Sequence, residues 1–82
     1  MSTAGPEVTV RFWAGARRAA GRAEERVVAP DVRTLRALLS ERPALATVVA
    51  ASSLLVDGVA PAVDAPLHDG AVVDVLPPFA GG

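Results

Sequence analysis

Hydrophobic and polar residues alternate along two short segments near the start of the chain. In residues 7–13, EVTVRFW, valines and a phenylalanine alternate with polar side chains, which is the two-residue period of a strand with one buried face. Residues 23–30, AEERVVAP, contain a second run of this kind. Between them, residues 14–21 predict a short helix or turn that ends at Gly21. The two runs therefore predict an antiparallel pair of strands.

A helical repeat follows this pair. Three leucines within residues 35–39 lie at i, i+3 and i+4, which places them on one face of a helix, and the hydroxyl of Thr34 is placed to cap its first turn. We expect this to be the main helix, and Pro43 either ends it or begins another. Residues 44–51, ALATVVAA, extend the helical region by a turn or two, although their β-branched side chains favour a helix less.

Two Asp-Gly turn signals divide the rest of the chain. The first, at 57–58, lies between apolar runs and predicts a strand before it. Because Pro61 cannot donate a backbone hydrogen bond, the residues after this turn are expected to form only an edge strand or a loop. The second signal, at 69–70, precedes the strand-forming run of residues 71–76, AVVDVL.

These elements predict one α+β domain over residues 7–76. Their order is strand, strand, helix, strand, weak strand, strand, which indicates a mixed sheet of four to five strands packed on one main helix. The other face of the sheet is then free, and an apolar patch on it would be a candidate surface for a partner protein. Residues 1–6 are small or turn-forming and are expected to be a flexible leader.

Composition narrows the class of protein. The chain has 82 residues, 51% of them hydrophobic, which suits one small folded domain and argues against disorder. No apolar run approaches the roughly 18 residues that span a bilayer, and the first residues lack the pattern of a signal peptide, so we expect a cytoplasmic protein without a membrane partner. The net charge of −1 provides no general attraction to nucleic acid. The arginines at 17, 18 and 22 are interpreted as a solvated face.

The body of the domain shows no active site. The sequence has no cysteine, which excludes a disulfide framework, a thiolate metal site and a cysteine nucleophile. His68 is the only histidine and is interpreted as a surface residue, because no second histidine or carboxylate pair stands at metal-ligand spacing. The serines and glycines match neither a nucleophile elbow nor a phosphate-binding loop. We therefore expect no catalytic residue, no metal and no bound cofactor.

The last six residues, PPFAGG, are a poor ending for a hydrophobic core. The two prolines end strand pairing and favour an extended path, so residues 77–82 are expected to form an extended tail with a reach of about 20 Å. Phe79 either packs on the domain or anchors the tail in a groove of a partner. Gly81 and Gly82 have no Cβ and pass through channels too narrow for other residues, although small terminal residues are also common in disordered ends. Adenylation by ATP would open the Gly82 carboxylate to attack by sulfur.

Four stretches of the chain resemble the MoaD and ThiS family of ubiquitin-like sulfur carriers. LPPFAGG at 76–82 and PLHDG at 66–70 resemble the end of these proteins. VRFWAGARRAAG at 10–21 and TLRALL at 34–39 extend the similarity over nearly the whole chain. The resemblance implies a ubiquitin-like β-grasp fold, in agreement with the element order above.

The resemblance also implies a function. In this family an E1-like adenylating and sulfurtransferase enzyme uses ATP to adenylate the terminal glycine, here Gly82, and a sulfur donor converts it to a thiocarboxylate. Gly81 would supply the narrow approach to that enzyme. Trp13 stands where the family places an aromatic residue for the activating enzyme, and Leu76 would help to form the same apolar partner surface. A core position for Trp13 is the other interpretation.

The Pro-Pro pair is closer to the small subunit of molybdopterin synthase than to the thiamin carrier. In that role the tail enters the large subunit, where the thiocarboxylate supplies the dithiolene sulfur of molybdopterin. Carriers for cysteine, thiamin or secondary-metabolite biosynthesis, which donate sulfur to other enzymes, share such an ending. A second class is a ubiquitin-like modifier conjugated to lysines, and a third is an interaction module in which the tail is incidental.

Overall fold

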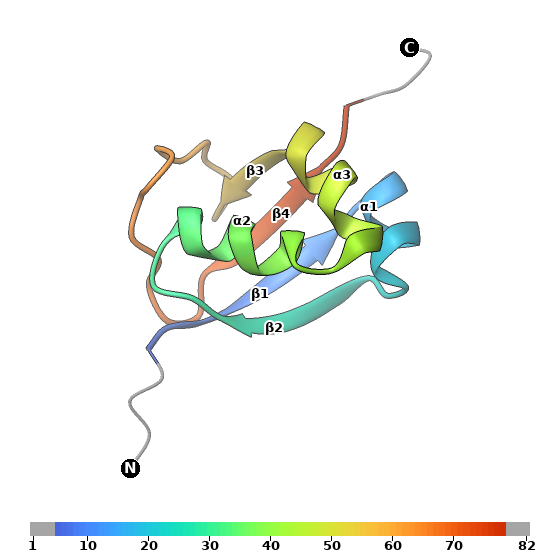
Figure 1. Ribbon diagram of the computed structural model, residues 1–82. Coiled ribbons are helices and arrows are strands. Elements are labelled where there is room, and N and C mark those ends of the chain that lie inside the picture. Colours follow the sequence, from blue (N-terminus) through green and yellow to red (C-terminus); the bar gives the residue numbers. More distant parts are fainter. Residues whose placement is uncertain (1–4, 79–82) are drawn as a thin grey trace.

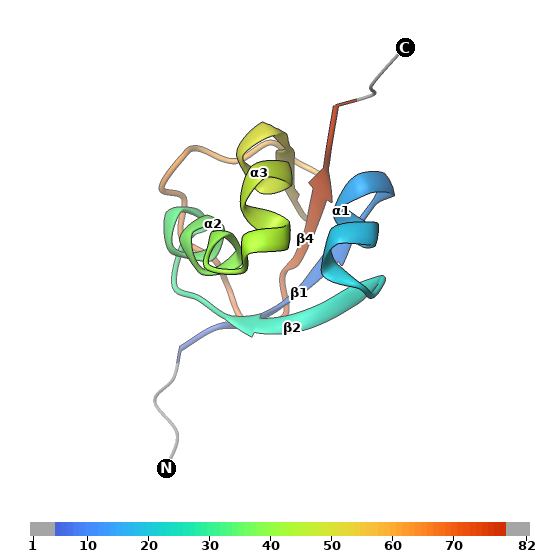
Figure 2. The same cartoon turned by 45° about the vertical axis from the view of Figure 1, so that its right-hand side comes forward.

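The computed structural model describes residues 5–78 and shows a four-stranded sheet with helices packed against it (Figure 1). The helices within residues 5–78 are α1 (Ala14–Ala20), α2 (Val32–Ser40) and α3 (Pro43–Ala51). The strands are β1 (Glu7–Phe12), β2 (Glu24–Val28), β3 (Ser53–Val56) and β4 (Val72–Leu76). Figure 2 shows α2 and α3 on the same side of the sheet, with α1 near the end of β4.

The strands lie in the order β2-β1-β4-β3. β1 pairs antiparallel with β2 and parallel with β4, and β4 pairs antiparallel with β3. The first and last strands of the chain therefore form the centre of the sheet. Because they are parallel, Glu7 and Leu76 lie at opposite ends of it. The predicted α+β class and mixed sheet are confirmed.

The core lies between the sheet and the two helices α2 and α3. The alternation read from the sequence sets which side chains of β1 and β4 point into it, because successive residues of a strand face opposite sides. The helices contribute the leucine stripe of α2 and two residues of α3. The buried residues of these four elements include Val8, Val10, Phe12, Leu35, Leu39, Leu45, Val49, Val73 and Val75.

The main helix begins two residues before the predicted cap. Asp31 is the N-cap of α2, and its Oδ1 accepts a hydrogen bond from the backbone N–H of Thr34 at 2.7 Å. The predicted cap at Thr34 was therefore wrong, because the carboxylate three residues earlier binds the free N–H group of the first turn. Pro43 begins α3, at a position where its missing N–H costs no helical hydrogen bond.

Residues after the Asp57-Gly58 turn do not form the weak strand. Asp57 and Gly58 have φ values of +50° and +83°, which confirms the tight turn. Val59 exchanges backbone hydrogen bonds with Val56 across the turn, and Pro66 forms an isolated bridge with Asp31, but neither contact extends into a strand. The chain then returns past the start of α2, where Val32 N–H donates to the carbonyl of Ala65 at 2.9 Å. β3 therefore pairs with β4 alone.

Residues 1–4 and 79–82 lie outside the described part of the chain. The predicted leader is described only at Gly5 and Pro6, and the predicted tail only at its two prolines. Phe79, Gly81 and Gly82 fall among the residues that are not described.

Candidate functional site

A cluster of three polar and aromatic side chains lies on the sheet face opposite α2 and α3. Arg11 of β1 and Asp74 of β4 are partners in the parallel register. Arg11 Nε donates to Asp74 Oδ1 at 2.8 Å, and its Nη2 donates to Oδ2 at 3.2 Å. The indole Nε1 of Trp13 donates to Asp74 Oδ1 at 2.8 Å. One carboxylate therefore holds both neighbouring side chains in place, through a two-point contact with the guanidinium.

Asp74 is charged yet only 8% exposed. The hydrogen bond from Arg11 holds the pKa of its carboxyl below the usual value, and the bond from Trp13 acts in the same direction. The same ion pair raises the pKa of Arg11. A buried carboxylate with satisfied hydrogen bonds is stable in its ionised form. The charges of the cluster therefore neutralise each other.

Trp13 lies on the surface. Its side chain is 47% exposed, and the Arg11 guanidinium carbon lies 5.7 Å from the ring centroid. Its carbonyl accepts from Ala16 N–H at 2.9 Å at the start of α1, which fixes the backbone. A shallow hollow of about 230 Å³ lies beside the ring, with Arg17 and Glu24 among its lining residues. The core interpretation of Trp13 was therefore wrong.

Leu76 lies at the same end of the sheet as Trp13. The backbone N–H of Trp13 donates to the carbonyl of Val75 at 3.3 Å, which places it beside the end of β4. Leu76 is partly exposed, and so is Leu55, the β3 partner of Asp74. The structure thus brings the two predicted surface residues together where β4 ends and Pro77 begins. Their role in binding a partner stays a prediction.

Arg11 and Asp74 were not singled out in the sequence. The only signal was parity: each is a charged residue on the face of its strand opposite the buried valines. Parity alone does not show that the two strands are neighbours.

His68 lies at the other end of the sheet from Trp13. Its Nε2 is 2.6 Å from Asp57 Oδ2, and its Nδ1 is 2.9 Å from the carbonyl oxygen of Asp69. Both ring nitrogens thus face acceptors, which suits an imidazolium that donates two hydrogen bonds. The bond to Asp57 raises the pKa of His68, and the bond from the backbone of Val72 lowers the pKa of Asp57. His68 is exposed, as expected, and it joins the two Asp-Gly turns.

Two further findings concern residues 5–78. Within this range, no three His, Asp or Glu side chains come together in a group able to hold a metal ion. No helix within it is long and apolar enough to cross a membrane.

No family model and no curated protein matches the sequence. Solved structures do match. A chain in the complex of subunits 1 and 2 of molybdopterin-converting factor from Helicobacter pylori has a TM-score of 0.75 and 28% identity, over 93% of this chain and 99% of that one. Small archaeal modifier protein 1 from Methanosarcina acetivorans has a TM-score of 0.78 and 26% identity, over 94% and 97%. A putative subunit 1 of molybdopterin converting factor from Pyrococcus furiosus has a TM-score of 0.70 and 26% identity, over 92% and 100%.

The sheet order and these similarities define a ubiquitin-like β-grasp protein. Its solved neighbours are molybdopterin-converting factor subunits and small archaeal modifiers, so the resemblance to ubiquitin-like sulfur carriers of the MoaD and ThiS type is confirmed. These neighbours cover almost the whole of the chain, which places the protein among small ubiquitin-like carriers or modifiers.

Proposed function

We propose that the protein is a cytoplasmic sulfur carrier that serves as the small subunit of molybdopterin synthase and has no catalytic activity of its own. The observation that carries this proposal is the similarity to a chain from a complex of two molybdopterin-converting factor subunits, with a TM-score of 0.75 over 93% of this chain. A large subunit is accordingly the proposed acceptor of the sulfur.

The proposed reactive group is the carboxylate of Gly82. An E1-like enzyme binds the chain and ATP, a carboxylate oxygen attacks the α-phosphorus, and pyrophosphate leaves. Hydrosulfide then attacks the acyl carbon, the bond from that carbon to the AMP oxygen breaks, and AMP leaves, so that the chain ends in a thiocarboxylate. Gly81 has no side chain to obstruct the approach, and Phe79 anchors the tail in the partner. These three assignments rest on the sequence.

The surface around Trp13 supports contact with a partner at the base of this tail. Trp13 presents an exposed aromatic ring, and aromatic residues are enriched among those that dominate binding energy. Arg11 and Asp74 already neutralise each other, so a partner that covers them does not bury an unpaired charge. Leu76 lies between this surface and the prolines. An apolar surface of the activating enzyme or of the large subunit is therefore suited to cover it.

The test is the intact mass of the protein after incubation with ATP, sulfide and a candidate activating enzyme. The expected gain corresponds to replacement of one oxygen by sulfur, and it is absent from a variant that lacks Gly82. The activated protein is then mixed with a large subunit and the molybdopterin precursor, and formation of the dithiolene is measured. An unchanged mass, with an activating enzyme that is competent on another carrier, would contradict the proposal.

A lysine-conjugated modifier is the second candidate function. The similarity to small archaeal modifier protein 1, with a TM-score of 0.78, favours it. The sequence contains no lysine, so such a modifier would not form lysine-linked chains with itself. Lysine-linked adducts of the terminal glycine, found by mass spectrometry in cells of the source organism, would support this function. The same search would detect only the thiocarboxylate if the protein is solely a carrier.

A further inference from the structure

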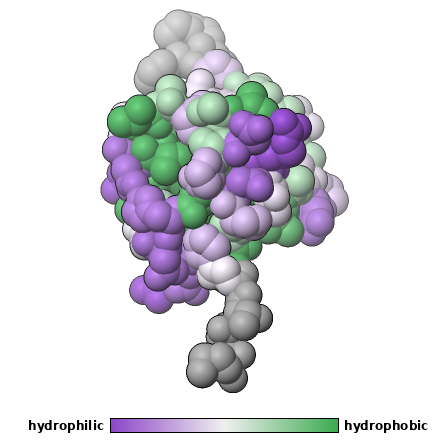
Figure 3. Space-filling model, turned by 90° about the vertical axis from the view of Figure 1, so that its left-hand side faces the viewer, coloured by the Kyte–Doolittle hydropathy of each residue, from purple (hydrophilic) through white to green (hydrophobic). Residues whose placement is uncertain are grey.

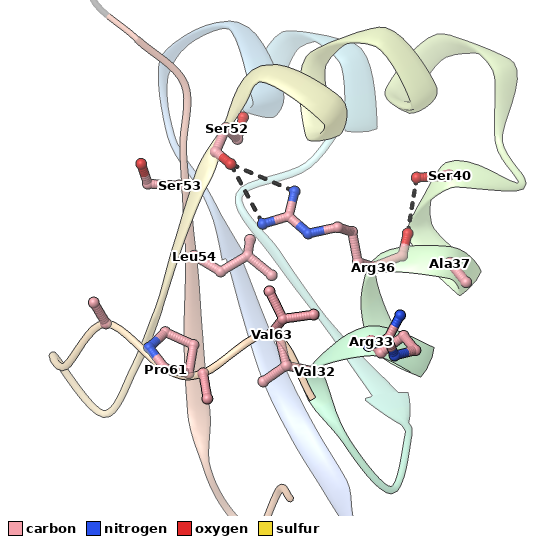
Figure 4. A pocket seen from close by; sticks show the side chains of 12 residues that line it. Val32, Arg33, Arg36, Ala37, Ser40, Ser52, Ser53, Leu54, Pro61 and Val63 are labelled. Atoms are coloured by element: carbon pink, nitrogen blue, oxygen red, sulfur yellow. Dashed lines mark hydrogen bonds between the residues drawn. The ribbon is translucent and has the colours of Figure 1, made fainter. Parts of the chain in front are cut away.

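A second surface feature lies away from the Trp13 cluster, between α2, β3 and the loop of residues 60–63. It is a groove of about 670 Å³ (Figure 4). The side of the domain on which β3 forms the sheet edge shows hydrophobic residues next to strongly hydrophilic ones (Figure 3). The groove uses neither Trp13 nor the tail, so binding of a ligand in it does not depend on the proposed function.

The walls of the groove are largely apolar. Val32 of α2 and Leu54 of β3 belong to the core and form its floor. Pro61 and Val63 form the opposite wall, and the Val63 side chain is 70% exposed. Figure 4 shows these side chains gathered around the same space. A single exposed valine is ordinary, but an exposed valine that faces an apolar floor provides a site for an apolar side chain.

Two arginines of α2 make the rim of the groove positive. Arg36 lies across the end of the groove, where its Nη1 donates to the Val49 carbonyl at 2.7 Å and to the Ser52 carbonyl at 3.4 Å. These bonds hold its charge in a fixed place. Arg33, three residues earlier in α2, is exposed.

Neither arginine has a carboxylate partner within the chain as far as it is described. In the same part of the chain, Arg11, Arg26 and Arg42 each form an ion pair. Arg36 bonds only to backbone carbonyls, and no ion pair of Arg33 is observed among residues 5–78. Two positive charges beside an apolar groove are complementary to a ligand that has carboxylates next to apolar side chains.

We propose that this groove binds a segment of a partner protein in which acidic residues lie next to apolar ones. The apolar side chains occupy the space between Leu54 and Val63, and the carboxylates pair with Arg33 and Arg36. The groove is open along one side, which suits a protein segment better than a small molecule that needs burial on most of its surface. Ser53, at one end of the groove, pairs with Leu76. A partner bound here therefore lies close to the end of β4.

The test uses the full chain, labelled with ¹⁵N, and the peptide acetyl-Leu-Val-Asp-Glu-amide. We expect saturable changes in the amide signals of Arg33, Leu54 and Val63, with little change at Trp13. Two matched peptides separate the contributions. Acetyl-Leu-Val-Lys-Lys-amide retains the apolar part with the opposite charge, and acetyl-Ser-Ser-Asp-Glu-amide retains the charge alone. Both are expected to bind at least about five-fold more weakly. Loss of one surface ion pair accounts for a factor of this size, and loss of one buried apolar side chain accounts for more.

A pair of protein variants completes the test. Arg33→Glu is expected to weaken binding of the acidic peptide about five-fold or more, whereas Arg22→Glu makes the same charge change on an exposed residue outside the groove and is expected to have little effect. Several results would overturn the proposal: equal binding of the lysine peptide, signal changes confined to the surface around Trp13, equal binding of octanoate as a small-molecule ligand, or concentration-dependent changes without peptide that indicate self-association.

Discussion

Asp74 stabilises the domain and also holds the side chains of Arg11 and Trp13 in place. We expect Asp74→Asn to reduce the free energy of unfolding at pH 7 by about 1–3 kcal/mol, because an amide cannot accept from Arg11 and Trp13 as two carboxylate oxygens do. Urea unfolding measures the change. Asp64→Asn, at an exposed residue outside the cluster, is the matched control and should change stability by less than about 0.5 kcal/mol.

The pH dependence of this difference has a definite sign. The pKa of Asp74 is lowered in the folded protein, so its contribution is present above the ordinary value of about 3.9 and is lost as pH falls through the lowered pKa. The stability difference between the protein and Asp74→Asn should therefore shrink in strongly acidic solution. A difference that stays constant down to acid pH would contradict the assignment of the charge.

The pH dependence of the contribution of His68 to stability has the opposite sign. Asp57 raises its pKa above the ordinary value of about 6.5, so the stabilisation is present below that value and is lost as pH rises through the raised pKa. We expect Asp57→Asn to move the pKa of His68 back towards 6.5, because asparagine tolerates the positive φ of the turn but carries no charge. NMR titration of the imidazole measures the pKa of His68 in both proteins. An unchanged pKa in this variant would mean that Asp57 does not stabilise the charged form.

At the level of single residues, the sequence predicted which face of its strand a side chain lies on, but not which side chains lie close together. It placed Arg11 and Asp74 on outward faces of their strands, yet 63 positions separate the two in the chain, and no local pattern reports such a contact. The position of Trp13 was undecided for the same reason. Whether a side chain after a strand is covered depends on where the following helix packs, which is a property of the folded domain.

At the level of secondary-structure elements, the finding that Asp31 and not Thr34 caps α2 gives a prediction. Asp31→Ala is expected to destabilise the protein by about 0.5–2 kcal/mol, because the N–H of Thr34 loses its carboxylate acceptor. Thr34→Ala retains that N–H and should cost less. Thermal or urea unfolding of the two variants decides between them, and a larger loss for Thr34→Ala would show that its hydroxyl is the more important group.

Local patterns predicted most of the elements because each pattern has a direct physical cause. Alternating valines can bury one face of a strand, and a stripe of leucines can bury one face of α2. Of the two structures expected after Asp57-Gly58, the edge strand was wrong and the loop is confirmed, because β-forming residues need an available strand to pair with. The backbone N–H and carbonyl of Val59 bond to those of Val56 at the turn, and Pro61 has no backbone N–H to donate. The chain therefore continues as a loop.

For the whole molecule, the proposed partner surface gives a prediction that separates binding from folding. Trp13→Ala is expected to slow thiocarboxylate formation at limiting activating enzyme by at least about ten-fold, the effect of losing an anchor worth roughly 1.4 kcal/mol or more. The control is Val59→Ala, at a side chain that is 67% exposed and lies outside the surface around Trp13. The rate of mass change under otherwise identical conditions is measured. Equal rates for the two variants would exclude Trp13 from the contact.

The order of the strands was beyond the reach of local patterns. Residues 7–30 indicate the β1-β2 pair, since a short connection favours neighbouring antiparallel strands. Nothing local shows that β4 lies between β1 and β3. The family resemblance predicted a β-grasp fold, and the structure supplies the strand order.

The central position of β4 also has a consequence for synthesis of the protein on the ribosome. β1 is made first and β4 last, yet each is the other's neighbour in the sheet. Until residues 72–76 have left the exit tunnel, β1 has an unpaired edge and the core lacks two valines of its central layer. The surface around Trp13 also lacks its carboxylate until then. A nascent chain therefore acquires its fold and its proposed recognition surface in the same late event, and an enzyme that recognises this surface discriminates against unfinished chains.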